Sequence, residues 1–236
     1  MFGSVQPTQF DLRFHLFGIP VTVTPWFWLA GILGGWQSSI GEHLDLLFIW
    51  IGCLFVSILV HELGHAFLAK SFGWPPEVFL YLFGGVAVYR PGYGHTTTRS
   101  VLISLAGPGA GFALYGLIRL LRELAVSSGW IHTLDPAWQL RLVDFFFQME
   151  WINLWWGIVN LIPVLPLDGG RVAEALLLRA RPWNGRRQAA MLSIVVSAAV
   201  AFYFFAINKN FGTFPAMLFA MLCITNVQSL QQHSPW

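Results

Sequence analysis

Residues 45–70 read DLLFIWIGCLFVSILVHELGHAFLAK. The part at 46–60 carries no charge, and the motif His-Glu-Leu-Gly-His follows at 61–65. Two histidines four residues apart lie one turn above each other on a helix, so both imidazoles can meet one metal ion while the Glu between them reaches a water. The segment therefore predicts a metal site with a general base inside a helix that is apolar enough to cross a membrane.

The composition of the whole chain is that of an integral membrane protein. Of its 236 residues, 56% are hydrophobic and only 10% are charged, against roughly 25% charged residues in soluble domains. We expect an all-α multi-pass membrane protein with small membrane-associated strands. Apolar runs predict about six transmembrane helices, at 22–41, 45–70, 100–121, 145–166, 190–207 and 211–228.

The remaining segments are too short for a separate soluble domain, so we expect a single membrane-embedded domain over 1–236. The N-terminus lacks the pattern of a removable signal peptide, and the first span is therefore expected to act as a signal anchor. A net charge of +2 is too small to indicate nucleic acid as a partner.

Two short segments have the composition of strands. Residues 10–23 begin with alternating apolar and polar side chains and end in β-branched residues, which predicts an interfacial strand or hairpin before the first span. Residues 78–89 are rich in strand formers around a Gly-Gly pair, which predicts a second hairpin.

The second hairpin could bind an extended substrate as an added strand. Spacing alone gives equal weight to the alternative, a simple cytoplasmic connector. The candidate residues for this strand edge are Phe79, Leu80, Tyr81, Leu82, Phe83, Gly84 and Gly85.

The fourth predicted span is interrupted at its end, where residues 160–170 read NLIPVLPLDGG. Two prolines and two glycines disfavour a continuous helix, and an aspartate at membrane depth needs a charged partner or a polar cavity. A catalytic zinc typically takes three protein ligands, so Asp168 is our candidate for the third, with Glu174 as the alternative. Asn160 is a candidate for holding a substrate backbone or an oxyanion, and an interhelical hydrogen bond is its equally weighted alternative.

Together these residues predict a zinc hydrolase with one Zn²⁺ ion per chain. Zinc held by His61, His65 and Asp168 would polarise a scissile carbonyl and lower the pKa of a water toward ~7. Glu62 would take a proton from that water and later pass one to the leaving amine.

Two other classes of protein were weighed. A zinc transporter predicts polar residues repeated along several spans, whereas in this sequence they concentrate at one depth. An inactive protein that keeps this metal site but only sequesters membrane segments is disfavoured by the intact Glu62.

Basic residues predict the orientation in the membrane. Six spans place both termini on one side, and nine basic residues fall on that side against four on the other. The positive-inside rule then puts both termini in the cytoplasm, and it places the basic segment 171–184 at the interface as a topology anchor. His61 lies roughly 24 Å along its helix from Asp45, so the active site is expected to open toward the cytoplasm.

In its metal-site motif and its interrupted fourth span, the sequence resembles the site-2 protease family of intramembrane zinc metalloproteases. The motif at 61–65 resembles the family's zinc helix, 83–85 its hairpin, and 106–108 its third-span motif. Residues 160–170 resemble its signature Asn-x-x-Pro-x-x-Pro-Leu-Asp-Gly-Gly. The resemblance implies zinc ligands at His61, His65 and Asp168, a catalytic base at Glu62 and a substrate-positioning residue at Asn160.

The resemblance also implies the substrate class and the location. Family members cut transmembrane segments of membrane-anchored regulators or leftover signal peptides, often after another protease has trimmed them. The compact six-span form is similar to minimal bacterial and archaeal members, which implies a prokaryotic cell membrane. The oligomeric state and the regulation do not follow from the sequence.

Overall fold

A computed structural model describes residues 8–39, 44–82, 84–207 and 214–232. The elements follow in the order β1 (Leu12–Leu16), β2 (Ile19–Val23), α1 (Pro25–Ser39), α2 (Leu44–Ser71), β3 (Pro76–Tyr81), β4 (Gly84–Tyr89), α3 (Thr97–Ser127), the 3-10 helix η1 (Trp130–Thr133), α4 (Pro136–Asn160), α5 (Asp168–Ala180), α6 (Gly185–Phe202), the π-helical turn η2 (Tyr203–Ile207) and α7 (Phe214–Gln232). The chain divides into two compact units, Met1–Tyr93 with Ala106–Gly157, and Gly94–Leu105 with Ile158–Trp236.

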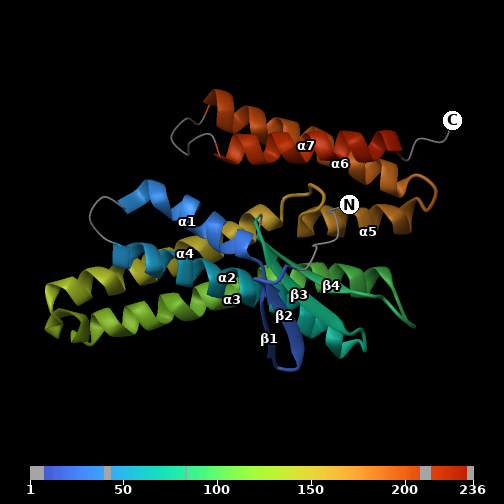
Figure 1. Ribbon diagram of the computed structural model, residues 1–236. Helices are drawn as coiled ribbons and strands as arrows, with labels where there is room; N and C mark the ends of the chain where they lie inside the picture. Colours follow the sequence, from blue (N-terminus) through green and yellow to red (C-terminus); the bar gives the residue numbers. More distant parts are fainter. Residues whose placement is uncertain (1–7, 40–43, 83, 208–213, 233–236) are drawn as a thin grey trace. The chain divides into compact units, whose positions relative to one another are not determined.

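Both predicted hairpins are present, and in the first unit they join into one sheet with the order β1-β2-β3-β4 (Figure 1). β2 and β3 run parallel, while the two outer pairs are antiparallel. One face of the sheet packs on α2, where a buried apolar core excludes water. Its members include Ile19, Val21 and Val23 of β2, Val78 and Leu80 of β3, and Ile58, Leu59 and Leu63 of α2.

The sheet corrects the predicted substrate edge. Phe79 and Leu80 each pair with β2 on one side and with β4 on the other, so neither can accept a further strand. A local sequence pattern predicts the hairpin but not its parallel partner, which lies 57 residues earlier in the chain, because such pairing is a long-range contact. The outer strand next to β3 is β4, and the predicted Phe83 lies outside the described residues.

Four helices of the described residues are long and apolar enough to cross a membrane, at Leu44–Ser71, Thr97–Ser127, Gly185–Ala206 and Phe214–Gln232. They correspond to the predicted spans at 45–70, 100–121, 190–207 and 211–228. The 15 residues of α1 reach about 22 Å at 1.5 Å per residue, short of a ~30 Å hydrocarbon layer. The predicted span at 22–41 began too early, because residues 22 and 23 belong to β2, and its last two residues lie outside the described part.

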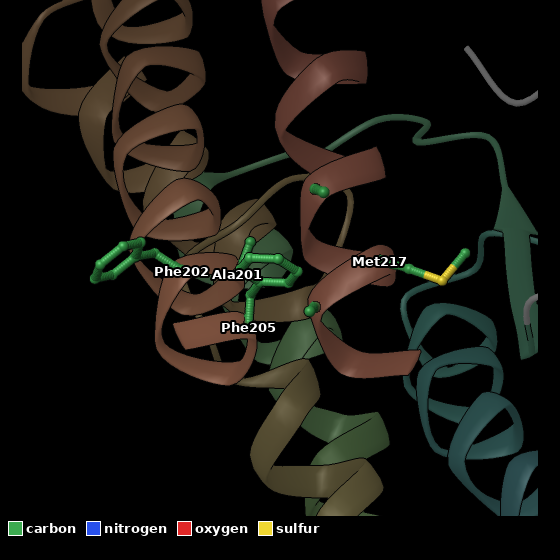
Figure 2. A pocket seen from close by; sticks show the side chains of 6 residues that line it. Ala201, Phe202, Phe205 and Met217 are labelled. Carbon is green, nitrogen blue, oxygen red and sulfur yellow. The ribbon is translucent and has the colours of Figure 1, made fainter. Parts of the chain in front are cut away.

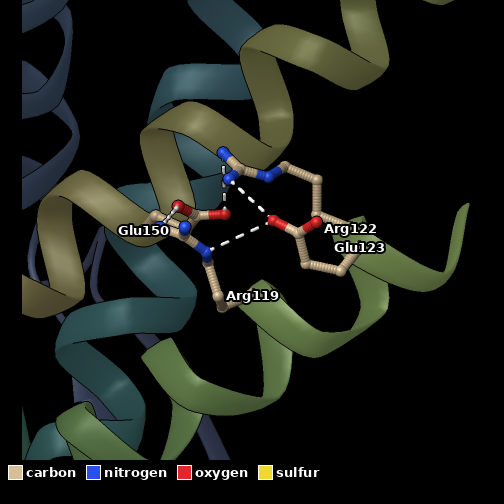
Figure 3. Close-up of polar contacts among 4 residues, drawn as sticks. All are labelled: Arg119, Arg122, Glu123 and Glu150. Carbon is tan, nitrogen blue, oxygen red and sulfur yellow. Dashed lines mark hydrogen bonds and ion pairs between the residues drawn. The ribbon is translucent and has the colours of Figure 1, made fainter. Parts of the chain in front are cut away.

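The helix α4 is not among these four, although its 25 residues are enough to cross a bilayer. Its buried Glu150 lies between two arginines of α3, 3.6 Å from Arg119 and 3.1 Å from Arg122 (Figure 3). Glu123 accepts from the same two arginines. Ionisable side chains at membrane depth need such partners, so the cluster offsets the cost of burying the Glu150 carboxylate between the helices.

The second unit contains the break that the sequence predicted. α4 ends at Asn160, and regular structure resumes at Asp168. The segment predicted as a basic interfacial connector is mostly helix α5, whose residues follow an amphipathic pattern. A cleft of about 540 Å³ between α6, η2 and α7 is lined by Ala201, Phe202, Phe205, Ala216, Met217 and Ala220 (Figure 2). This lining is apolar and brings no group suited to metal chemistry.

Candidate metal centre

The motif residues lie on the buried face of α2 in the first unit. His61, Glu62 and His65 are only 2%, 5% and 7% exposed. The two imidazole rings lie with their centroids 5.0 Å apart, as expected for histidines one helical turn apart. Trp156 of α4 packs edge-on against His61, with the two ring centroids 6.4 Å apart. Two imidazoles and a carboxylate are thus held in apolar surroundings, where burial is costly unless they have a function or partners.

Glycines of α2 and α3 let the two helices approach closely at this face. A Cβ at Gly64 would overlap the Ala106 carbonyl oxygen, and a Cβ at Gly107 would overlap the His65 ring. The spacing of Gly107 and Gly111 is the small-xxx-small pattern typical of close helix packing. The structure shows that what packs against Gly107 is a predicted zinc ligand, so Gly107 sets the position of the His65 imidazole.

The Gly-Gly pair at the start of β4 lies beside the predicted general base Glu62 and Trp156. Gly84 has φ of +123°, which side chains rarely adopt, and a Cβ there would lie 2.7 Å from the Trp156 ring. A Cβ at Gly85 would overlap the Glu62 side chain, 2.8 Å from its Oε1. Bare backbone is therefore required where β4 passes the predicted general base.

The hydrogen bonding of the sheet gives the direction of the β4 peptide groups. Thr24 donates its backbone N–H to the Leu80 carbonyl at 3.0 Å, so the peptide groups of Leu80 face β2. Leu80 pairs with Gly85 and Val78 with Ala87, and in an antiparallel pair alternate residues point outward. The N–H and C=O groups of Gly85 and Ala87 therefore point away from β3, toward the outer edge of the sheet.

The other predicted site residues belong to the second unit. Asp168 is 7% exposed and begins α5, where a carboxylate is favoured by the helix dipole. Gly169 and Gly170 follow it, and a Cβ on either would overlap backbone of the preceding loop, 161–165. Asn160 is buried at the last position of α4.

The alternative ligand Glu174 has a different partner. Its Oε1 accepts from Arg186 Nε at 3.2 Å, near the start of α6. The first unit thus brings together His61, Glu62, His65, Gly84 and Gly85, and the predicted residues Asp168 and Asn160 belong to the second unit.

Comparison of the sequence with known proteins points to one family of peptidases. The profile of peptidase family M50 matches residues 118–204. A zinc metalloprotease of Methanocaldococcus jannaschii is 32% identical over 171 residues, which are 70% of this chain and 44% of that protein. Residues 118–204 thus match the peptidase M50 domain, and about two thirds of the chain is similar to zinc metalloproteases.

Further similarities agree with the match to this family. Stage IV sporulation protein FB of Bacillus subtilis is 30% identical over 167 residues, 70% of this chain and 50% of that protein. A solved site-2 protease from Methanocaldococcus jannaschii has the same fold, with a TM-score of 0.62 and 23% identity over 94% of this chain and 95% of that one. The predicted resemblance to the site-2 protease family is confirmed.

These relatives also agree with the predicted metal. Zinc is the metal in the names of the matched metalloproteases. The apolar helices together with the family match support an integral membrane protein. The chain spans 40% to 50% of the length of the first curated relatives that it matches.

Proposed function

We propose that this chain is an intramembrane zinc metalloprotease that hydrolyses a peptide bond in or near the transmembrane segment of a membrane-anchored protein. The observation that carries the proposal is the position of Glu62. It lies between two buried histidines on an apolar helix and against the bare backbone of an outer strand. A general base, a metal-binding pair and a peptide-binding edge thus meet within one unit.

The donor set fits one zinc ion. Two imidazoles and a carboxylate form a ligand set of catalytic zinc, which leaves a fourth position for water or substrate. We assign the three positions to His61, His65 and Asp168, each of which is buried. Glu174 is not proposed, because its carboxylate is paired with Arg186.

The proposed reaction is the addition of water to a peptide carbonyl. When bound, zinc supplies a Lewis acid for that carbonyl and lowers the pKa of the attacking water. Glu62 accepts the proton that the water loses and delivers it to the nitrogen of the leaving amine. Asn160 is proposed to hold the substrate backbone or the developing oxyanion through its amide group.

The substrate must be extended before it can be cut. A helical segment keeps its carbonyls engaged in hydrogen bonds, so a transmembrane helix has to unwind locally. We propose that the unwound segment pairs with β4 through the outward peptide groups of Gly85 and Ala87. Because Gly85 packs against Glu62, a strand bound there would pass next to the general base.

The proposed setting follows from the sequence. We propose six spans, with α1 and α4 added to the four apolar helices, and with both termini and the active-site opening in the cytoplasm of a prokaryotic cell. The proposed substrates are membrane-anchored regulators or signal-peptide remnants that another protease has already trimmed.

The Asp168→Asn variant tests the ligand set. An amide is a weaker zinc ligand than a carboxylate, so zinc measured by elemental analysis in the purified protein is expected to fall well below one ion per chain. Cleavage of a tagged transmembrane substrate in proteoliposomes should fall with it, and a chelator should abolish cleavage by the unmodified protein. Full zinc retention would reopen the search for the third ligand, whereas zinc flux without cleavage would favour a transporter.

The Ala87→Pro variant tests the substrate edge. Proline removes an N–H that points away from β3, so the sheet keeps its ladder while a bound strand loses one hydrogen bond. We expect kcat/KM for a transmembrane substrate to fall roughly fivefold to tenfold, the equivalent of about 1 to 1.4 kcal/mol, with zinc content unchanged.

The opposite edge of the same sheet provides the matched control. His15 of β1 pairs with Pro20 of β2, which faces β3 because Thr24 does and alternate residues of a strand face the same side. The peptide group of His15 therefore also points outward from the sheet. The His15→Pro variant should cleave at the original rate. Equal rates for both proline variants would remove the β4 edge from the mechanism.

A further inference from the structure

Two buried polar side chains stand out in the apolar helices of the second unit. Ser193 of α6 is 1% exposed and Asn226 of α7 is 5% exposed. The two helices lie side by side (Figure 1). Burying a polar group in such surroundings costs free energy unless the group is hydrogen-bonded, and its hydrogen-bond partners indicate its role.

Both side chains bind the same residue of the loop between α4 and α5. Leu165 donates its N–H to Ser193 Oγ at 2.9 Å, and its carbonyl accepts from Asn226 Nδ2 at 2.7 Å. Each side chain also binds its own helix: Ser193 Oγ donates to Ala189 O and Asn226 Nδ2 to Leu222 O, both at 2.8 Å. Leu165 is thereby held to α6 through its N–H and to α7 through its carbonyl.

Leu165 lies three residues before Asp168, and the segment between them is closely fixed. Leu167 donates its N–H to the Val164 carbonyl at 2.8 Å, and Arg171 Nε donates to the Pro166 carbonyl at 3.2 Å. A Cβ at Gly170 would overlap the Leu165 nitrogen, so the first turn of α5 rests on this same peptide. A shift of Leu165 would therefore move the start of α5 and the Asp168 carboxylate with it.

We propose that Ser193 and Asn226 are positioning residues for the metal ligand Asp168. They fix the backbone of Leu165 to α6 and α7, and the rigid loop transmits that position to the carboxylate. The inference rests on the proposed function, since it takes Asp168 to be a zinc ligand. Outer partners that orient a ligand commonly change metal affinity 10- to 100-fold when they are removed.

A matched pair of serines on α6 tests the proposal. Ser197 lies one turn from Ser193 and is fully buried, but its Oγ donates to carbonyls of its own helix, at Ser193 and Ile194. We expect Ser193→Ala to lower zinc affinity roughly tenfold, measured by competition with a chromophoric chelator in detergent. Ser197→Ala should keep the original affinity, although both variants lose one buried hydroxyl.

On α7 the corresponding pair is Asn226 and Thr225. Asn226→Leu keeps the volume but removes the donor to Leu165, and a loss of roughly 10- to 100-fold in zinc affinity is expected. Thr225→Val is the control, because the Thr225 hydroxyl donates to Leu222 O of its own helix. Asn226→Gln should restore part of the affinity, since the longer side chain keeps the donor. If Asn226→Leu fails to fold, the serine pair decides the question alone.

A second set of variants separates this inference from the proposed function. In an Asp168→Asn background, Ser193→Ala should no longer change zinc affinity, because the ligand that it positions has been removed. Equal zinc affinities of Ser193→Ala and Ser197→Ala, with Asp168→Asn still impaired, would overturn the positioning role alone. An unchanged zinc affinity of Asp168→Asn would instead overturn the proposed ligand set and the inference that rests on it.

Discussion

The Glu62→Gln variant is expected to lose peptide hydrolysis while it keeps its zinc. The amide has the same shape as the carboxylate, so it can keep the packing against Gly85, but it cannot accept a proton from the attacking water. Proton transfer by a positioned side chain typically contributes 10²- to 10⁴-fold, and we expect a loss of about 10³-fold or more. The measurement is cleavage of a tagged transmembrane substrate in detergent, with zinc determined on the same sample.

Glu174→Gln provides the control for this change. It makes the same chemical replacement at a carboxylate of the second unit, which is paired with Arg186 and was the alternative zinc ligand. Both its zinc content and its rate of cleavage should match those of the unmodified protein. Undiminished cleavage by Glu62→Gln would contradict the proposed role of Glu62 as general base. Loss of zinc from Glu174→Gln would indicate that Glu174 is a zinc ligand.

Local features of this protein were readable from its sequence. The helix that carries the motif, the two hairpins and the break after Asn160 all follow from periodicity, strand formers, proline and glycine. These signals act over a few residues, so a linear pattern contains them. Asp168 was found in the same way, because a carboxylate in an interrupted membrane helix needs a partner.

Contacts between segments far apart in the chain could not be predicted from the sequence. The parallel pairing of β2 with β3 makes β3 internal, and this excludes Phe79 and Leu80 from the candidate substrate edge, whereas the predicted Gly84 and Gly85 lie in the outer strand β4. Ser193 and Asn226 were not among the predicted site residues, although a polar residue within an apolar span is itself a signal. The sequence does not reveal that both side chains bind Leu165, because Leu165 lies 28 residues from Ser193 and 61 residues from Asn226.

Gly107 shows how a single contact can change the meaning of a residue. In an exposed helix interior, alanine is favoured over glycine by about 1 kcal/mol, so propensity alone predicts that a Gly→Ala change in α3 stabilises the protein. At Gly107 the added methyl group would meet the His65 ring, and at the exposed Gly109 it would meet no atom within 4 Å. The two positions share one helix and differ in this contact, and Gly107 also precedes Pro108, whose ring disfavours a residue with a Cβ before it in a helix.

Gly107→Ala is therefore expected to displace the His65 imidazole and to weaken zinc binding by roughly 100-fold or more, since a ligand moved by about 1 Å no longer meets the metal. Gly109→Ala should keep both zinc affinity and cleavage. Zinc affinity is measured by chelator competition, and thermal unfolding of the two metal-free variants reports any general loss of packing. A stable metal-free Gly107→Ala protein that binds zinc as tightly as Gly109→Ala would show that the ring can move without cost. In that case α3 would have no part in placing the ligand.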